Sequence, residues 1–175
     1  MSNLYLIVPG YGNSGENHWQ THFEHQLPGA KRVEQKNWEQ PICADWVDAI
    51  DTAVRACPSN DVVLIGHSLG CIAIAHWAQQ HAVVIRGALL VAPPDLENPH
   101  EELPIQGFIP IPLLSLPFPS IVVASNNDPW ASLERSRFFS EKWGSRLIFL
   151  ENAGHINADA GFGEWKEGLQ LLSRF

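Results

Sequence analysis

The chain has 175 residues, of which 45% are hydrophobic and 17% are charged, and this balance excludes a disordered polypeptide that cannot form a core. Its formal net charge of −8 at pH 7 and its lack of a basic run disfavour a nucleic-acid partner. No apolar run approaches the roughly 18 residues that cross a bilayer, and the N-terminus lacks the basic region of a secretory signal, so we expect one cytoplasmic domain over residues 1–175 with no membrane partner.

The first third of the chain predicts two strands and two helices. Residues 4–8 form a short apolar run that a Pro-Gly pair ends, which is typical of a buried strand. Residues 16–26 have helical spacing, and residues 31–35 are a weaker strand candidate. Residues 41–57 form the clearest helix, because apolar side chains recur at helical spacing between two prolines.

The middle of the chain predicts a strand, a helix, a second strand and an irregular segment. Residues 61–65 are an apolar strand, residues 69–81 are helical, and residues 83–91 are again a strand with Gly87 as a weak point. Eight of the 13 prolines lie between positions 93 and 119. A structured excursion is expected there, and it is too short to form a second domain.

The last third predicts a strand at 119–125, a helix at 130–143, a strand at 146–150 and a closing helix at 162–175. Six strand candidates therefore alternate with helices. Strands that are apolar throughout are covered on both faces, which is typical of a parallel sheet between two helical layers. We predict an α/β fold with about six mostly parallel strands.

The first candidate catalytic motif is G-H-S-L-G at residues 66–70. It fits the pattern G-x-S-x-G and lies between a predicted buried strand and a predicted helix. This context is the one that a nucleophile elbow requires, with Ser68 as the nucleophile. Glycine at 66 and 70 has a steric reason, because a side chain there would collide with the neighbouring strand or helix. The alternative is an ordinary Gly-Ser turn in which Ser68 caps the helix.

A serine hydroxyl needs a base, and His155 is the best candidate because it follows the last predicted strand and so reaches the same sheet edge as Ser68. His67 adjoins Ser68, but neighbouring side chains at a sharp turn diverge. The other histidines that we weighed lie on predicted helices: His18, His22, His25, His76 and His81. The first three are spaced by four and three residues, which leaves a metal site as an alternative, although the glutamate of H-E-x-x-H is absent.

A carboxylate should hold the imidazole, and two aspartates compete for this role. Asp128 in N-N-D-P-W follows the strand at 119–125, and we favour it. Asp95 in P-P-D-L follows the preceding strand, and it stays open whether Asp95 assists or replaces Asp128. The alternative interpretation of Asp128 is a structural role in an Asp-Pro turn.

The oxyanion of an acyl-transfer reaction needs backbone donors. We predict the N–H groups of Leu69, at a helix start, and of Tyr11, with Gly10 as the fallback. The surrounding string G-Y-G-N-S-G also fits G-x-G-x-x-G, but no acidic residue follows at the ribose-binding distance, which disfavours a dinucleotide. The three cysteines have neither disulfide nor zinc spacing, so no cofactor and no metal are expected.

Four motifs in order resemble one family: V-P-G-Y-G-N-S-G-E-N-H-W, G-H-S-L-G, N-N-D-P-W and A-G-H-I-N. They are similar to the small serine hydrolases of the α/β-hydrolase superfamily that include retinoblastoma-binding protein nine and bacterial YdeN-type proteins. The resemblance implies an α/β-hydrolase fold without a large cap domain, with Ser68 as nucleophile, Asp128 as acid and His155 as base. The chain has Pro-Gly where many lipases have His-Gly, which puts the oxyanion geometry in doubt.

The expected function is hydrolysis of small acyl esters through an acyl-enzyme on Ser68, with amides or thioesters as alternative substrates. Gly10, Trp130 and Phe108 are the candidate substrate-binding residues, and ordinary core packing is the competing interpretation of the proline-rich segment. The second hypothesis is a protein-binding module with an idle triad, which the partner-binding name of one relative suggests. A complete Ser, Asp and His in order argues against it.

Overall fold

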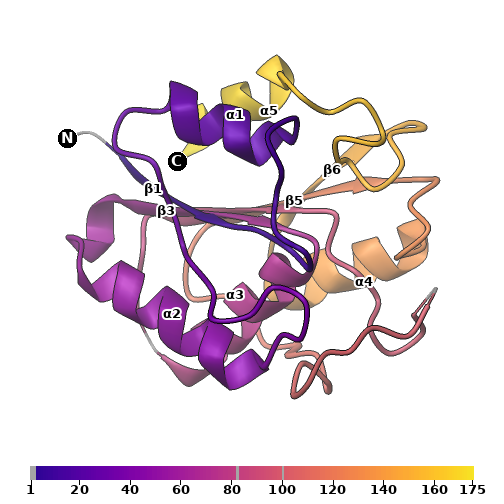
Figure 1. The fold of residues 1–175 in the computed structure, drawn as a ribbon, viewed down its shortest axis with the longest axis horizontal. Helices are drawn as coiled ribbons and strands as arrows, with labels where there is room; N and C mark the ends of the chain where they lie inside the picture. The colour runs from indigo at the N-terminus through magenta and orange to yellow at the C-terminus, as the bar shows by residue number, and fades with distance from the viewer. Residues whose placement is uncertain (1–2, 82, 100) are drawn as a thin grey trace.

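The computed structural model describes residues 3–81, 83–99 and 101–175, and its centre is a six-stranded, fully parallel sheet (Figure 1). The predicted α/β fold is confirmed. The strands lie in the order β2-β1-β3-β4-β5-β6. Their bounds are β1 (Leu4–Val8), β2 (Lys31–Arg32), β3 (Val62–His67), β4 (Gly87–Val91), β5 (Ser120–Ser125) and β6 (Arg146–Leu150).

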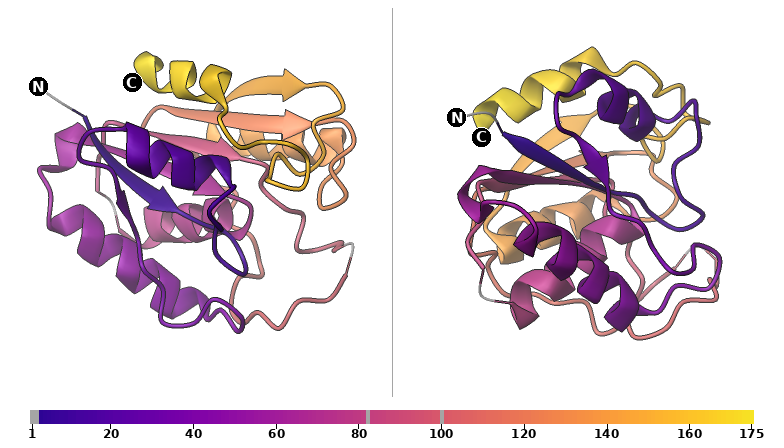
Figure 2. Two further views of the ribbon diagram at one scale, coloured as in Figure 1. Left: turned by 45° about the horizontal axis from the view of Figure 1, so that its top comes forward. Right: turned by 60° about the vertical axis from the view of Figure 1, so that its left-hand side comes forward.

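Helices cover both faces of this sheet (Figures 1 and 2). On one face lie α1 (Trp19–Gln26) and α5 (Lys166–Leu171). On the other face lie α2 (Cys43–Arg55), α3 (Leu69–Gln80) and α4 (Leu133–Trp143). Two short 3-10 helices, η1 (Ser59–Asp61) and η2 (Leu172–Arg174), complete the elements.

The central strands are buried on both faces because their side chains alternate between two cores. In β3, Val62 and Leu64 pack with α2 and α3, whereas Val63 and Ile65 pack toward Trp19 of α1 and the C-terminal helices. All four of these strand side chains are fully buried. This two-sided burial explains the continuous apolar runs in the sequence.

The proline-rich segment after β4 is irregular, as expected, and no helix or strand is assigned in its described part. It docks on the start of α2: the backbone N–H of Cys43 donates to the carbonyl of Gln106 at 2.8 Å, and the N–H of Gln106 donates to the carbonyl of Pro41 at 2.9 Å. Within the described residues, no separate helical layer covers the carboxyl edge of the sheet, in agreement with the predicted lack of a large cap.

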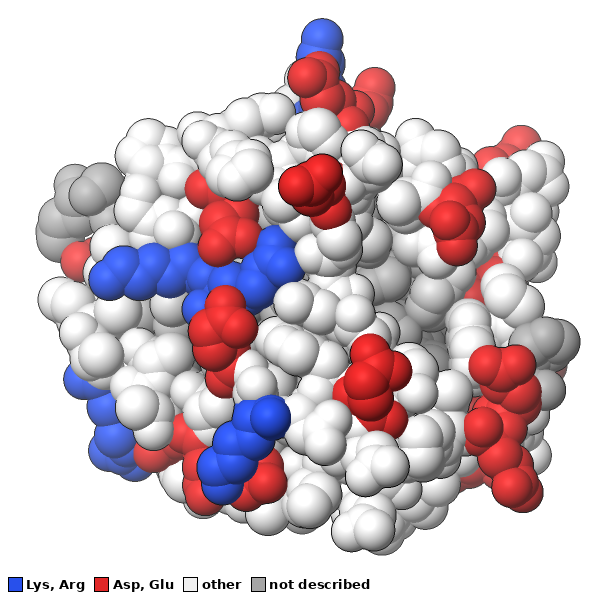
Figure 3. Space-filling model, in the orientation of Figure 1, with Lys and Arg blue, Asp and Glu red and all other residues white. Residues whose placement is uncertain are grey.

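Two further features bear on partners. No helix in the described part of the chain is both long and apolar enough to span a bilayer. On the face drawn in Figure 3, acidic side chains are spread widely and the basic side chains lie beside acidic ones. That face therefore has no extended basic surface of the kind that binds a phosphate backbone.

Candidate active site

Ser68 stands in a strained turn between β3 and α3. Its φ of 52° and ψ of −126° lie in a region that non-glycine residues rarely adopt. The turn is closed by glycines: a Cβ at Gly70 would lie 2.2 Å from the carbonyl oxygen of Val8, and one at Gly66 would lie 2.8 Å from a methyl group of Ile74. The steric reason given for both glycines is confirmed, and the tight packing holds Ser68 in its unusual conformation.

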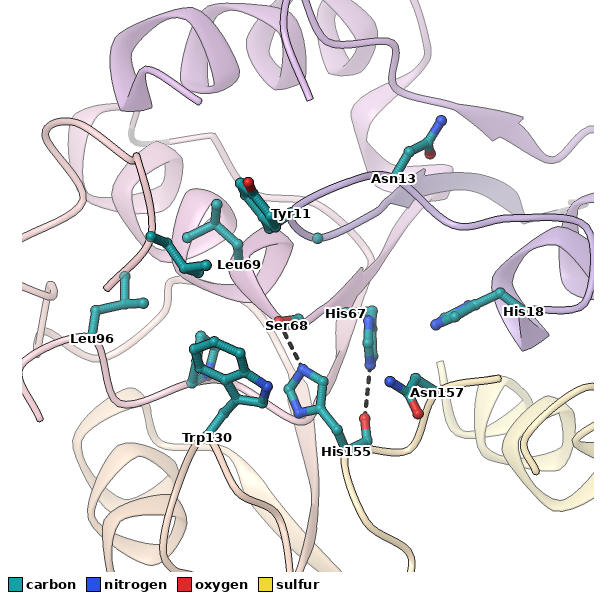
Figure 4. A pocket seen from close by; sticks show the side chains of 13 residues that line it. Tyr11, Asn13, His18, His67, Ser68, Leu69, Leu96, Trp130, His155 and Asn157 are labelled. Carbon is teal, nitrogen blue, oxygen red and sulfur yellow. Dashed lines mark hydrogen bonds between the residues drawn. The ribbon is translucent and has the colours of Figure 1, made fainter. Parts of the chain in front are cut away.

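The structure brings Ser68, His155 and Asp128 together, although 87 residues separate the first two. Figure 4 shows the hydrogen bond between Ser68 and His155. The Oγ of Ser68 lies 2.9 Å from Nε2 of His155, and Nδ1 of His155 lies 2.9 Å from each carboxylate oxygen of Asp128. A carboxylate only accepts hydrogen bonds, so Nδ1 carries the proton and Nε2 is left as an acceptor for the serine hydroxyl. This tautomer can remove a proton from Ser68.

Asp128 and His155 are held by their surroundings before any substrate binds. The Asp128 side chain is only 3% exposed, and its Oδ1 also accepts from the backbone N–H of Trp130 at 2.9 Å. The two loops that carry these residues are joined by a further network. The amide oxygen of Asn127 accepts from the N–H of Gly154 at 2.7 Å, and Ser125 Oγ accepts from the N–H of Ala153 at 2.9 Å. Asp128 and His155 are therefore positioned as one unit.

His67 holds the backbone of His155. Its Nε2 lies 2.9 Å from the carbonyl oxygen of His155, to which it donates. Burial lowers the pKa of His67 well below its usual value, with smaller contributions from the positive charges that His155 and His18 would carry. A neutral His67 with its proton on Nε2 fits this hydrogen bond. It is a residue that reasoning from the sequence considered only as a base, and its place inside the G-x-S-x-G motif was the available signal.

A cavity of about 160 Å³ opens above Ser68. Its lining includes the largely apolar residues Tyr11, Leu69, Pro94, Leu96, Leu103 and Trp130, and the polar residues Asn13, His18 and Asn157. Figure 4 shows Trp130 and Leu96 on one side of Ser68, and His18 and Asn157 on the other. We call the side with Leu96 and Trp130 the apolar side, and the side with His18 and Asn157 the polar side (Figure 4). Gly10 and Trp130, predicted to bind substrate, both line this cavity.

The loop after β1 packs closely against the turn that carries Ser68, because Gly10 has no side chain. A Cβ at Gly10 would lie 2.8 Å from Ser68 Cβ and 3.3 Å from the backbone nitrogen of Leu69. In the described residues, the N–H groups of Tyr11 and Leu69 donate to no other backbone group. Leu69 is the first residue of α3, where the helix dipole favours negative charge. Their role as oxyanion donors stays a prediction.

The prediction that Phe108 walls the cavity is wrong. Its side chain is 1% exposed and packs edge-on against Trp46, while its carbonyl oxygen accepts from Nε2 of His76 at 3.0 Å. Phe108 is absent from the lining of the cavity and belongs to the core on the α2–α3 face. For Phe108 the alternative interpretation, that the irregular segment packs into the core, is the one that the structure supports.

Asp95 lies elsewhere in a separate ion pair. Its carboxylate is 3.2 Å from Nε of Arg135 and accepts from Nδ2 of Asn98 at 3.0 Å. No hydrogen bond joins Asp95 to His155 in the described part of the chain. Asp128 is thus the aspartate beside the imidazole.

The three histidines weighed as a metal site have different surroundings. His18 lines the cavity, whereas His22 lies against Gly163. Among the described residues, no group of three or more His, Cys, Asp or Glu side chains has the arrangement of a metal site.

The comparisons agree with this geometry. A profile of the serine hydrolase family matches residues 5–174. A solved structure described as a YdeN-like hydrolase from Pectobacterium atrosepticum is 37% identical, with a TM-score of 0.86 over 99% of this chain and 90% of that one. The ydeN gene product of Bacillus subtilis is 23% identical, with a TM-score of 0.79 over 99% and 98% of the two chains.

More distant likeness extends to esterases. The carboxylesterase CesB of Bacillus subtilis is 12% identical, with a TM-score of 0.70 over 98% of this chain and 83% of that one, a likeness of fold alone. None of the curated proteins matches the chain. The family profile spans nearly the whole sequence and includes Ser68, Asp128 and His155. The chain belongs to the serine hydrolase family.

Proposed function

We propose that this protein hydrolyses small acyl esters through an acyl-enzyme on Ser68. The observation that carries the proposal is the unbroken series of hydrogen bonds from Ser68 Oγ to His155 Nε2 and from His155 Nδ1 to Asp128, at the floor of an open cavity. Nucleophile, base and orienting acid are thereby present in one place. Membership of the serine hydrolase family supports the same conclusion.

In the first half-reaction, Ser68 Oγ attacks the ester carbonyl while its proton passes to Nε2 of His155. Asp128 then stabilises the imidazolium through the proton on Nδ1. When the carbonyl–oxygen bond to the alcohol breaks, Nε2 returns the proton to the departing alkoxide. In the second half-reaction a water molecule attacks the acyl carbon while its proton passes to Nε2. When the bond from this carbon to Ser68 Oγ breaks, Nε2 returns the proton to Oγ and the carboxylic acid leaves.

The negative oxygen of each tetrahedral intermediate requires donors near Ser68. The backbone N–H groups of Leu69 and Tyr11 are proposed for this role, since both residues line the cavity and neither amide is used by another backbone group in the described residues. Such donors act on charge that develops in the transition state, and losing one typically costs about 3 kcal/mol.

The size of the cavity favours short substrates. Its volume of about 160 Å³ is small beside the roughly 300–1,000 Å³ that is common for pockets of drug-sized ligands. The apolar side, with Leu96 and Trp130, suits a short hydrocarbon chain. Comparing the turnover of an oxygen ester, a thioester and an anilide of one short acid, at equal concentration, would show which bond type the protein cleaves fastest.

The test is active-site labelling with a fluorophosphonate, together with turnover of p-nitrophenyl acetate and butyrate. We expect the wild type to be labelled and to release nitrophenol, and Ser68→Ala to do neither. Equal labelling of the two proteins, or no labelling of the wild type, contradicts the catalytic proposal. The second outcome with a folded wild type favours the non-catalytic binding module.

Two aspartate variants form a matched pair for the orienting acid. We expect Asp128→Asn to lower kcat by about a thousandfold or more, because the amide no longer fixes the tautomer of His155. Asp95→Asn changes the same kind of group near the same sheet edge, and we expect kcat within about twofold of wild type because its contacts are with Arg135 and Asn98. A reversed order of the two losses would assign the role to Asp95.

A further inference from the structure

His18 has a buried ring nitrogen, Nε2, with no hydrogen-bond partner among the described residues, and its ring makes a T-shaped contact with the ring of His67 at 4.7 Å between centroids. The residue is 7% exposed and lines the cavity above Ser68. Almost none of the surface of its Nε2 is exposed. Buried polar groups are nearly always paired, because an unpaired one has lost its hydrogen bonds to water without gaining others. A group left unpaired at the wall of a cavity points to a partner that enters the cavity.

The protonation of the His18 ring follows from its other nitrogen. His18 is the N-cap of α1, and its Nδ1 accepts the backbone N–H of Gln20 at 3.2 Å. Burial, with a contribution from the Arg32 guanidinium, lowers the pKa of His18 to about 4, so the ring is neutral near pH 7. A neutral ring that accepts at Nδ1 carries its single proton on Nε2. His18 therefore offers a donor, and not an acceptor, toward the cavity.

Asn157 adds a second donor on the same side. Its Oδ1 already accepts from the backbone N–H of Ala160 at 3.0 Å, which leaves the Nδ2 group to donate. No protein group in the described part of the chain accepts from this nitrogen. In Figure 4 the ring of His18 and the amide of Asn157 both point toward the space beside His67. The polar side of the cavity is thus donor-rich, and it faces the apolar side across Ser68.

We infer that His18 and Asn157 form a subsite for a hydrogen-bond-accepting oxygen of the substrate, such as an ether, carbonyl or hydroxyl oxygen a few bonds from the scissile ester. This inference rests on the proposed esterase function and adds a substrate class to it: short esters with an acceptor oxygen in one arm and hydrocarbon in the other. Because Nε2 of His18 is buried in the structure, the proposal requires a small side-chain adjustment of the kind that commonly accompanies binding.

The experiment uses two pairs of esters that differ by one CH₂-to-oxygen exchange. On the acyl side the pair is p-nitrophenyl butyrate and p-nitrophenyl methoxyacetate. On the alcohol side the pair is butyl acetate and 2-methoxyethyl acetate, followed by acid release at constant pH. Intrinsic reactivity differs within a pair, but it cancels when the loss of kcat/KM from wild type to variant is compared.

Two variants separate the cavity donor from the helix cap. The amide of His18→Asn reaches the position of Nδ1 and retains the cap, but it withdraws the donor at Nε2. The longer amide of His18→Gln reaches the position of Nε2 and retains the donor. We expect His18→Asn to lose about tenfold in kcat/KM on the oxygen-bearing ester of one pair and less than about twofold on its hydrocarbon partner, while His18→Gln loses less than about threefold on both. The pair that responds identifies the side of the substrate that the subsite holds.

Equal losses on both members of both pairs, or no loss on any, would overturn the subsite. A binding measurement keeps the result independent of turnover. In Ser68→Ala protein with ¹⁵N-labelled histidine, 2-methoxyethyl acetate or p-nitrophenyl methoxyacetate should shift the His18 ring resonances, and the hydrocarbon partners should not. If these shifts occur but the wild-type protein hydrolyses none of the four esters, the proposed function is refuted and the subsite is supported. If no shifts occur, the subsite is refuted.

Discussion

At the scale of single residues, the proposed site depends on the side chains that hold His155 as much as on His155 itself. His155 is fixed from three directions: its Nδ1 faces Asp128, its Nε2 faces Ser68, and its carbonyl oxygen accepts from His67. The residue after it, Ile156, has a φ of 48°, so the loop at this point has a conformation that needs support from its neighbours. His67 supplies such support from the core.

This arrangement makes His67 a positioning residue. We expect His67→Leu to lower kcat by about tenfold, with KM changed by less than about twofold, because the imidazole of His155 loses its orientation while the other residues that line the cavity are unchanged. His67→Gln retains a donor near Nε2 and should recover most of the rate. Steady-state kinetics on p-nitrophenyl butyrate measure both. A loss confined to KM, or no recovery with glutamine, would show that His67 acts in another way.

At the scale of elements, the strand–turn–helix unit at β3 and α3 is built by close backbone approach. Gly70 sits against the backbone of β1, and Gly10 sits against Ser68, so the loop after β1 and the turn after β3 fit together only without side chains at these positions. The same contact brings Tyr11 and Leu69 to one wall of the cavity. The packing of two elements thereby shapes the surroundings of the nucleophile.

Gly70→Ala tests this contact. A Cβ there would lie 2.2 Å from the carbonyl oxygen of Val8 and 2.6 Å from that of Pro9, and neither backbone atom can move freely. We expect a loss of about 1–3 kcal/mol or more in the free energy of unfolding, together with a loss of ester turnover. Gly15→Ala is the matched control, since a Cβ there meets nothing within 4 Å. Urea unfolding of both variants decides the point, and equal stabilities would contradict the packing argument.

At the scale of the whole molecule, buried neutral histidines tie stability to pH. The pKa of His18 falls from 6.5 to about 4 on folding, and that of His67 also falls. Between pH 6.5 and about pH 4 the unfolded chain binds a proton on His18 that the folded chain does not bind. The free energy of unfolding therefore decreases as the pH drops below about 6.5 and recovers above it. His18 alone contributes a loss of about 3 kcal/mol between pH 7 and pH 4.

We expect His18→Asn to weaken this dependence. Its N-cap is kept, but the group that titrates is gone, so the loss of stability from pH 7 to pH 4 should shrink by about 3 kcal/mol relative to wild type. Chemical unfolding at several pH values in this range measures it. A variant whose stability falls as steeply as that of wild type would mean that His18 is not buried as a neutral ring.

Much of the fold was predictable because it depends on local pattern. The apolar runs at β1 and β6 and the strand-to-helix context of Ser68 are properties of short segments, and they match the structure closely. Element ends were less predictable. The strand expected from residue 83 begins at Gly87, whose backbone packs against Phe175, and such a boundary is set by a distant contact.

The sequence by itself determined the parallel α/β architecture, the serine turn and the candidates Asp128 and His155, because apolar periodicity and the carboxyl ends of strands are readable along the chain. Only the tertiary structure placed Asp128 and not Asp95 beside His155, removed Phe108 from the cavity and brought His18 and Asn157 to the cavity above Ser68. Those outcomes depend on which loops meet in space and which donors find partners. The meeting of loops and the pairing of donors both depend on contacts between residues far apart in sequence, which no local sequence pattern encodes.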